Sequence, residues 1–182
     1  MANKEDIALM AHLMRRAGFG STREELEKLV DQGYEETVEE LLHPEDQPDI
    51  DEHELYRYLP MADIPGGVVY PKFHWLYYMV NSKRPLQEKI ALFWHQVFAT
   101  GISKVERGLA MLDQIQMFRD HGLGKFRNLL KELSSDPSMI FWLDNNENRE
   151  VEPNENYGRE ILELFSMGVS NYTEGDVKAA SK

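Results

Sequence analysis

A histidine and a carboxylate on one predicted helix are the first candidates for chemistry. Pro85 can open a helix that runs to about Ala99, and a helical projection puts Glu88 and His95, two turns apart, at the edge of its broad apolar arc. A histidine beside a carboxylate can act as a general base or as an oriented metal ligand. The pattern equally fits a histidine at the edge of the core that makes one hydrogen bond, and both interpretations stay open at this point.

A second group of polar residues follows an asparagine-rich loop. Glu155, Arg159 and Glu163 are spaced i, i+4, i+8, which is typical of a solvent-exposed helix face with alternating charge. Asparagines in the preceding loop tolerate left-handed backbone and bind neighbouring amides. We therefore predict a recognition surface here, made of Asn145, Asn154, Glu155 and Arg159.

The same helix could also hold a divalent metal. Asn156, Glu160 and Glu163 lie at i, i+4, i+7, and three oxygen ligands on one face suit a hard cation. Carboxylate di-iron bundles also need Glu-x-x-His pairs. This helix does not provide one, because the residue three positions after Glu160 is Glu163 and not a histidine. With His95 and Glu88, these two glutamates form the set of candidate catalytic residues.

Helix signals recur along the chain, while strand signals barely appear. Capping boxes at Ser21–Glu24 and Thr173–Asp176, with glycines and prolines at regular boundaries, predict about eight or nine helices in an irregular all-α bundle. Four prolines and a Gly-Gly pair predict a long irregular acidic loop over residues 44–70, with one short strand at Val68–Tyr70 at most. The helix after the asparagine loop is predicted to end at Gly168.

Length and composition exclude several classes of protein. The 182 residues suit a single helical module, and 42% hydrophobic residues is too high for a disordered chain. The absence of cysteine excludes disulfides, thiolate metal sites, iron–sulfur clusters and cysteine nucleophiles. No apolar run is long enough to span a membrane, and the N-terminal segment lacks a signal-peptide core, so a cytoplasmic location is the default expectation.

The net charge of −12 is concentrated in one stretch, which we call the acidic segment, Glu35–Glu54; it holds ten carboxylates and no Lys or Arg. Residues Lys83–Lys131, the basic region, hold nine Lys or Arg and four acids. The net charge predicts that nucleic acid is not a partner. The polarity fits a solvated face plus an acidic loop, or docking of these two regions on each other or on a partner.

Four strings of sequence resemble one bacterial family, domain of unknown function 1800. They are Leu13–Gly20 (LMRRAGFG), Arg84–His95 (RPLQEKIALFWH), Asp144-Asn145, and Pro153–Phe165 (PNENYGREILELF) followed by Gly168 and Tyr172–Glu174. The resemblance implies a link with envelope or polymer metabolism, because genes of the family often neighbour those of sulfatase-like proteins. Members of the family are usually longer, so we expect this chain to correspond to the N-terminal part of the family domain.

Two functions are consistent with the sequence. The first is a binding or structural module of a larger protein, whose partner would be the C-terminal part of the family domain or another protein. The second is part of a hydrolase, with or without a metal, that acts on envelope polymers or sulfate esters. The two differ in whether His95 and Glu88 meet the Asn154–Glu163 segment in the folded chain, as an active site would require.

Overall fold

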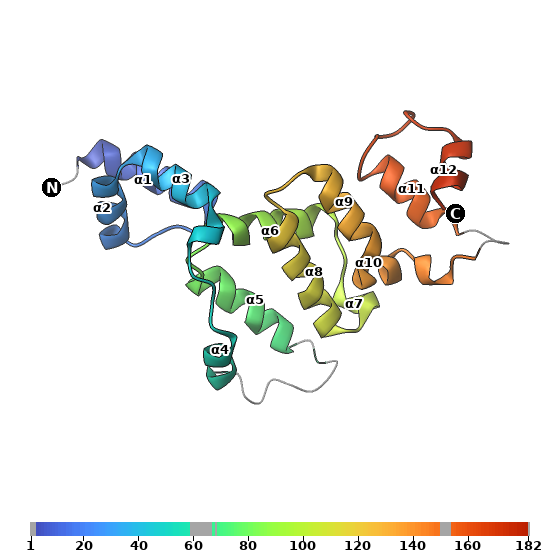
Figure 1. Cartoon of the computed structure of the whole chain (residues 1–182), viewed down its shortest axis with the longest axis horizontal. Coiled ribbons are helices and arrows are strands. Elements are labelled where there is room, and N and C mark those ends of the chain that lie inside the picture. Colours follow the sequence, from blue (N-terminus) through green and yellow to red (C-terminus); the bar gives the residue numbers. More distant parts are fainter. Residues whose placement is uncertain (1–2, 59–66, 68, 150–153, 182) are drawn as a thin grey trace.

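The computed structural model describes residues 3–58, 67, 69–149 and 154–181, and within these ranges the protein is helical without strands (Figure 1). The all-α prediction is therefore confirmed. The described residues form twelve α-helices and two 3₁₀ turns, somewhat more elements than predicted. Within the same residues, no helix combines the length and apolarity that crossing a bilayer needs.

One end of the molecule is built by α1 (Lys4–Ala17), α2 (Arg23–Gln32) and α3 (Tyr34–Leu42) (Figure 1). Thr22 and Glu25 form the reciprocal capping box that starts α2, one residue later than the box predicted at Ser21–Glu24. The amphipathic helices bury a first core, made of Ile7, Met10, Met14, Ala17, Leu26 and Leu41. This unit joins the rest of the protein where Gly18 meets the start of α6: a Cβ at this glycine would lie 2.9 Å from Cβ of Pro85, so only glycine permits the approach.

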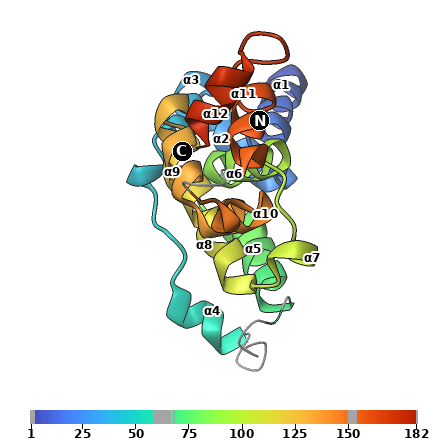
Figure 2. The ribbon, with the colours of Figure 1, turned by 90° about the vertical axis from the view of Figure 1, so that its right-hand side faces the viewer.

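The centre consists of α5 (Val69–Asn81), α6 (Pro85–Val97), α7 (Ile102–Val105), α8 (Gly108–His121), α9 (Phe126–Ser135) and α10 (Pro137–Trp142). A second and larger core lies among them, with Ala91, Phe98, Phe118, Leu129, Leu133 and Met139 almost completely buried. Figures 1 and 2 show α6 and α8 crossing in the middle of the molecule, with α5 on one side of α8 and α9 on the other. The helix predicted from Pro85 is thus central.

The other end carries α11 (Glu155–Glu163) and α12 (Glu174–Ala180), which pack on each other. Tyr157, Ile161 and Phe165 join the larger core from this side. The predicted continuation of α11 to Gly168 is wrong, since the helix ends at Glu163 and a tight turn follows. The amides of Met167 and Gly168 bond to the carbonyl of Leu162, which closes the turn.

The prediction of one irregular loop over residues 44–70 is also wrong. A 3₁₀ turn, η1 (Pro44–Asp46), and a short helix, α4 (Glu52–Tyr58), lie in this stretch, and α5 already begins at Val69. Asp51 starts α4, since its carboxylate accepts the amide of His53 at 2.8 Å, and Leu55 anchors the helix because it is completely buried. Val69 and Tyr70, the described residues of the short strand expected at Val68–Tyr70, form the first turn of α5 instead. Pro65 and Gly66 lie outside the described residues.

Candidate functional site

Glu88 is completely buried on α6, and its partner is Arg119 of α8. Arg119 Nε donates to Oε1 of Glu88 at 2.7 Å, and the guanidinium lies 4.2 Å from the centre of the Tyr78 ring. Burial raises the pKa of Glu88, while the positive charge of Arg119 acts in the opposite direction. The pair therefore stabilises the α6–α8 crossing, and Glu88 has no contact with His95 that would orient the imidazole.

The acidic segment docks on the basic region through Asp49. Its carboxylate pairs with Nη2 of Arg119 and with Nη1 of Arg84, both at 3.0 Å, and Arg84 also donates two hydrogen bonds to the carbonyl of Gln47. Partial burial opposes the shift, but the Ile50 amide and the two guanidinium groups hold the pKa of Asp49 below its ordinary value. This confirms the alternative in which the oppositely charged regions contact each other.

A second contact of the acidic segment comes from Glu52, the first residue of α4. Its Oε1 accepts a hydrogen bond of 2.6 Å from the Tyr78 hydroxyl and lies 3.0 Å from Nε2 of His74, both on α5. Burial and the neighbouring Glu52 raise the pKa of Tyr78, so the phenol stays protonated. Together, Asp49 and Glu52 fix the chain between α3 and α4 across the surfaces of α5, α6 and α8.

His95 lies at the edge of the core among aromatic rings. Its imidazole packs edge-on against Trp75, with 5.1 Å between ring centres, and also contacts Phe118. Burial lowers the pKa of His95, and a hydrogen bond with Gln114 only partly offsets this, so the ring is neutral at pH 7. Its Nδ1 is buried and has no hydrogen-bond partner among the described residues.

Gln114, which sequence reasoning missed, joins three segments. Its amide nitrogen donates to Asp136 at 2.6 Å, its oxygen accepts the hydroxyl of Thr100, and Asp136 in turn caps α10 by accepting the Met139 amide at 2.7 Å. Gln114 is completely buried. The Asp-Pro start of α10 could be predicted from sequence, but no local signal identifies a glutamine that binds the cap from another helix.

The asparagine side chains of the loop hydrogen-bond to neighbouring segments of the chain. Asn154 donates to the carbonyl of Asp144 at 3.0 Å, and Asn156 donates to that of Leu143, also at 3.0 Å. Asn148 binds both the Asn145 side chain and the carbonyl of Ser181. These bonds join the end of α10, the start of α11 and the end of α12, and they use the amide of Asn154 and the side-chain oxygen of Asn145, two members of the predicted recognition surface.

The charged face of α11 turns toward α12. Arg159 makes two hydrogen bonds to Glu174, at 3.0 and 2.9 Å, and lies 3.6 Å from Glu155. Glu163 accepts the hydroxyl of Tyr172 instead of continuing the predicted charge ladder. Glu160 is half-buried.

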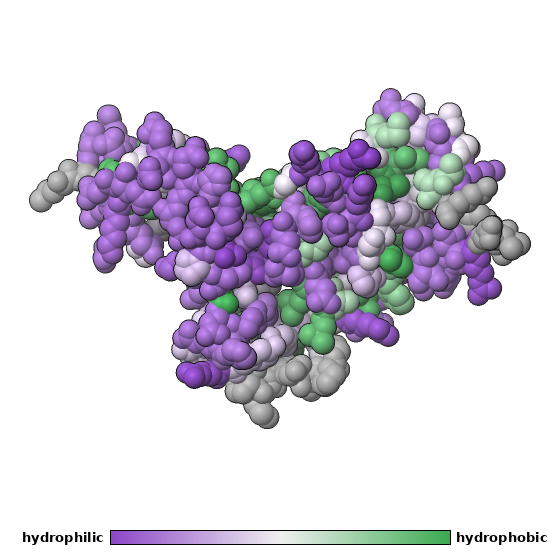
Figure 3. Space-filling view, viewed as in Figure 1, coloured by the Kyte–Doolittle hydropathy of each residue, from purple (hydrophilic) through white to green (hydrophobic). Residues whose placement is uncertain are grey.

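A row of exposed apolar side chains runs along α5. This α5 stripe consists of Val69, Phe73, Leu76 and Val80, whose exposed fractions are 52, 51, 51 and 72%. On the face shown in Figure 3, apolar side chains also gather over α6. Phe93 and Val97 of this helix are exposed as well. Isolated apolar residues are normal on a surface, but a continuous row is typical of an interaction site.

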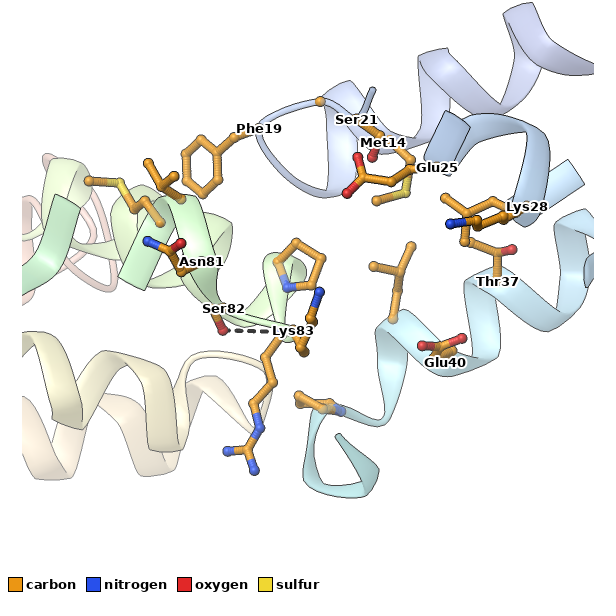
Figure 4. A pocket seen from close by; sticks show the side chains of 18 of the residues that line it. Met14, Phe19, Ser21, Glu25, Lys28, Thr37, Glu40, Asn81, Ser82 and Lys83 are labelled. Atoms are coloured by element: carbon orange, nitrogen blue, oxygen red, sulfur yellow. Dashed lines mark hydrogen bonds between the residues drawn. The ribbon is translucent and has the colours of Figure 1, made fainter. Parts of the chain in front are cut away.

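A hollow of about 780 Å³ lies where α5 and α6 meet the α1–α3 unit (Figure 4). Leu76 and Val80 line it, so the α5 stripe leads into the hollow. Phe19 extends from the α1–α2 loop toward the end of α5. The structure thus combines an apolar stripe with a recess at one end of it.

Comparison with protein families places the chain. Residues 12–182 match the family described as "Protein of unknown function (DUF1800)". The chain belongs to the DUF1800 family. No curated protein and no solved structure matches it.

In this DUF1800 protein the catalytic candidates do not converge. No hydrogen bond, ion pair or ring contact within the described residues joins Glu88 or His95 to α11. No three His, Asp or Glu side chains in the described ranges cluster as metal ligands would. The set of Asn156, Glu160 and Glu163 contains only two carboxylates, and a metal there stays a prediction.

Proposed function

We propose that this DUF1800 chain is a protein-binding module whose partner docks on the α5 stripe. The stripe carries the proposal because its four residues have the 4-3-4 spacing with which one helix packs against another. Burying them on a partner would remove apolar surface from water, which is the main favourable term in association. The recess next to Leu76 and Val80 offers room for a larger anchoring side chain.

The hydrolase alternative has weaker support. Glu88 is paired with Arg119, Glu163 is bound by Tyr172, and His95 has no carboxylate beside it. A general base needs a neighbour that orients it and a substrate within reach. The recognition surface predicted at Asn145, Asn154, Glu155 and Arg159 also has less support than the α5 stripe, since internal hydrogen bonds already use its groups.

Photocrosslinking in the native host tests the proposal. We expect benzoylphenylalanine at Leu76 to form an adduct with one protein, which mass spectrometry of the crosslinked peptide identifies. The same group at Lys131, exposed on α9, is the control and should give no adduct with that protein. The added substitution Val80→Asp should abolish the adduct because it puts a charge in the interface.

Two results would count against a binding module. One is the absence of any adduct at Leu76 under conditions where the protein is folded and abundant. The other is an adduct that forms equally from Lys131 or persists in the Val80→Asp variant, since the crosslink would then reflect random collision.

A further inference from the structure

We infer that the occupant of the α5 stripe is an amphipathic helix whose apolar row is flanked by acidic side chains, an inference that rests on the proposed binding function. Charge is the first argument. In the α5–α6 hairpin, Lys72 and Lys83 are exposed and Lys89 is half-exposed. None of these three lysines has an ion pair within the described residues. The single carboxylate of these two helices, Glu88, is buried against Arg119.

The lysines lie where flanking charges of a docked helix would fall. A helical projection places Lys72 next to the α5 stripe, and Lys83 lines the hollow together with Leu76 and Val80. Lys89 lies over the ring of Phe19, 4.9 Å from its centre, on the same side as the hollow. Acidic side chains on both sides of a docked apolar row could pair with them, as charges beside a coiled-coil seam do.

The recess gives the second argument, because the two carboxylates on its opposite wall form no ion pair with these lysines within the described residues; the pKa of Glu25 is lowered mainly by its hydrogen bonds with Thr22 and less by the charge of Lys83. Glu25 and Glu40 line that wall (Figure 4), but Glu25 accepts the Thr22 amide at 2.7 Å and Glu40 accepts two glutamine amides at 2.7 and 2.9 Å. Met14, Leu29 and Met79 give the hollow an apolar part, next to the polar Asn81 and Ser82 at the end of α5. A bulky apolar side chain from the partner fits this place.

Two other occupants fit the surface less well. A second copy that used the same stripe in a symmetric dimer would bring its own three lysines against Lys72, Lys83 and Lys89. An anionic membrane would attract the lysines but would also meet a chain with net charge −12. The α1–α3 unit also forms one wall of the hollow and would hold a flat bilayer away from Val80.

Calorimetric titration with three synthetic peptides of equal length tests the inference. All carry the apolar 4-3-4 row of a helix; the first has Glu at the flanking positions, the second has Lys there, and the third scrambles the Glu peptide. We expect the Glu peptide to bind at least about tenfold more tightly than the Lys peptide at low salt, with the ratio falling as salt rises. The scrambled peptide should not bind.

Variants locate the binding and its charge preference. Val80→Asp should abolish binding of the Glu peptide, and the triple change Lys72→Gln, Lys83→Gln, Lys89→Gln should reduce the Glu-to-Lys ratio to near one. Lys131→Gln on α9 is the matched control and should leave the ratio unchanged. All these positions are exposed or half-exposed, so circular dichroism should show the wild-type helix content.

Several outcomes would overturn the inference. Equal binding of the Glu and Lys peptides, or no binding of either, contradicts an acidic helix as partner. Sedimentation that shows a dimer lost in Val80→Asp identifies a second copy instead, and binding to phosphatidylglycerol vesicles lost in the triple variant identifies a membrane. If the Leu76 crosslink still forms in any of these cases, the binding function stands and only the chemistry of the partner is wrong.

Discussion

At the scale of residues, the buried charged side chains pair with each other and connect helices. Glu88 and Arg119 are both almost completely inaccessible, and Asp49 extends the pair to the surface. Removing two charges from water is costly, so breaking such a pair from one side is far more damaging than replacing both partners by apolar groups. This asymmetry gives a direct test of the pair.

Arg119→Met should lower the free energy of unfolding by about 3–5 kcal/mol, because it leaves Glu88 buried without a partner. The double change Arg119→Met with Glu88→Leu should recover much of the loss. Urea denaturation measures both variants, with Glu24→Ala, which breaks an exposed pair with Lys28, as a control expected to have little effect. A loss below about 1 kcal/mol for Arg119→Met would show that the buried pair is not important for stability.

Asp49 should make the free energy of unfolding depend on pH. Its pKa in the folded state lies below the ordinary 3.8, so its contribution is complete above about pH 4 and is lost as the pH falls through the lower folded value. We expect Asp49→Asn to cost up to about 1 kcal/mol at pH 7, since the half-exposed side chain is screened by solvent. The difference between variant and wild type should shrink near pH 3.

Urea denaturation of wild type and Asp49→Asn at pH 7 and pH 3 tests this prediction, with Glu36→Gln on the exposed face of α3 as the control. A difference that stays the same at pH 7 and pH 3 would mean that the charge of Asp49 does not hold the acidic segment in place.

At the scale of elements, local signals were enough wherever a cap or a breaker is decisive. The capping box at Thr173 and the proline starts of α6 and α10 were predictable from sequence, and the structure contains them; the box predicted at Ser21–Glu24 lies one residue later, at Thr22–Glu25. The stretch 44–70 was misread because α4 is only seven residues long and depends on tertiary contacts of Leu55 and Glu52. Short helices get most of their stability from packing, which a composition of prolines and acids does not reveal.

The contact between α11 and α12 depends on a glycine. A Cβ at Gly158 would collide with Oγ of Ser181 and lie 2.9 Å from the carbonyl of Val177. We expect Gly158→Ala to destabilise the protein by about 1–3 kcal/mol, since this backbone cannot retreat without losing the burial of Val177. Gly175→Ala in exposed α12 is the control and should be neutral or stabilising by up to about 1 kcal/mol.

Hydrogen exchange can show which helix is destabilised by Gly158→Ala. Amides of α12 should lose protection in Gly158→Ala while those of α8 keep it, and unchanged exchange in α12 would show that the two helices tolerate the added methyl group.

At the scale of the whole molecule, two cores are connected mainly through α6. The smaller core belongs to α1–α3 and the larger one to the centre, and Leu86 packs against the smaller core from the start of α6. Units that share few buried contacts open separately, each with its own free energy. The α1–α3 unit is also one wall of the hollow, so its opening would change the proposed binding surface.

Leu86→Ala should therefore reduce protection of α1–α3 amides by about 1–2 kcal/mol, less than for a fully buried leucine, and leave α8 and α9 nearly unchanged. Leu130→Ala, which removes a partly buried leucine from the larger core, is the matched variant and should show the opposite pattern. Native-state hydrogen exchange measures both. Equal losses everywhere in both variants would mean that the two cores unfold as one unit.

The candidate site was harder to predict than the fold. Sequence placed His95, Glu88, Glu160 and Glu163 on the correct helices, but it could not show that Arg119 and Tyr172 bind two of them. The α5 stripe could not be predicted, because a periodic row of apolar residues does not reveal whether another helix covers it. Which face is left uncovered is a property of tertiary packing.

The position of Gln114 has a consequence for the chemical ageing of the protein. Its neutral amide is what lets Thr100, Asp136 and α8 meet in a dry interior, with only 2.6 Å between its nitrogen and the Asp136 carboxylate. Hydrolysis of that amide needs water, so the burial of Gln114 protects it from deamidation as long as the core stays closed. If the core opened and a glutamate formed, it would return beside Asp136, and one of the two carboxyl groups would have to stay protonated for the interior to close again.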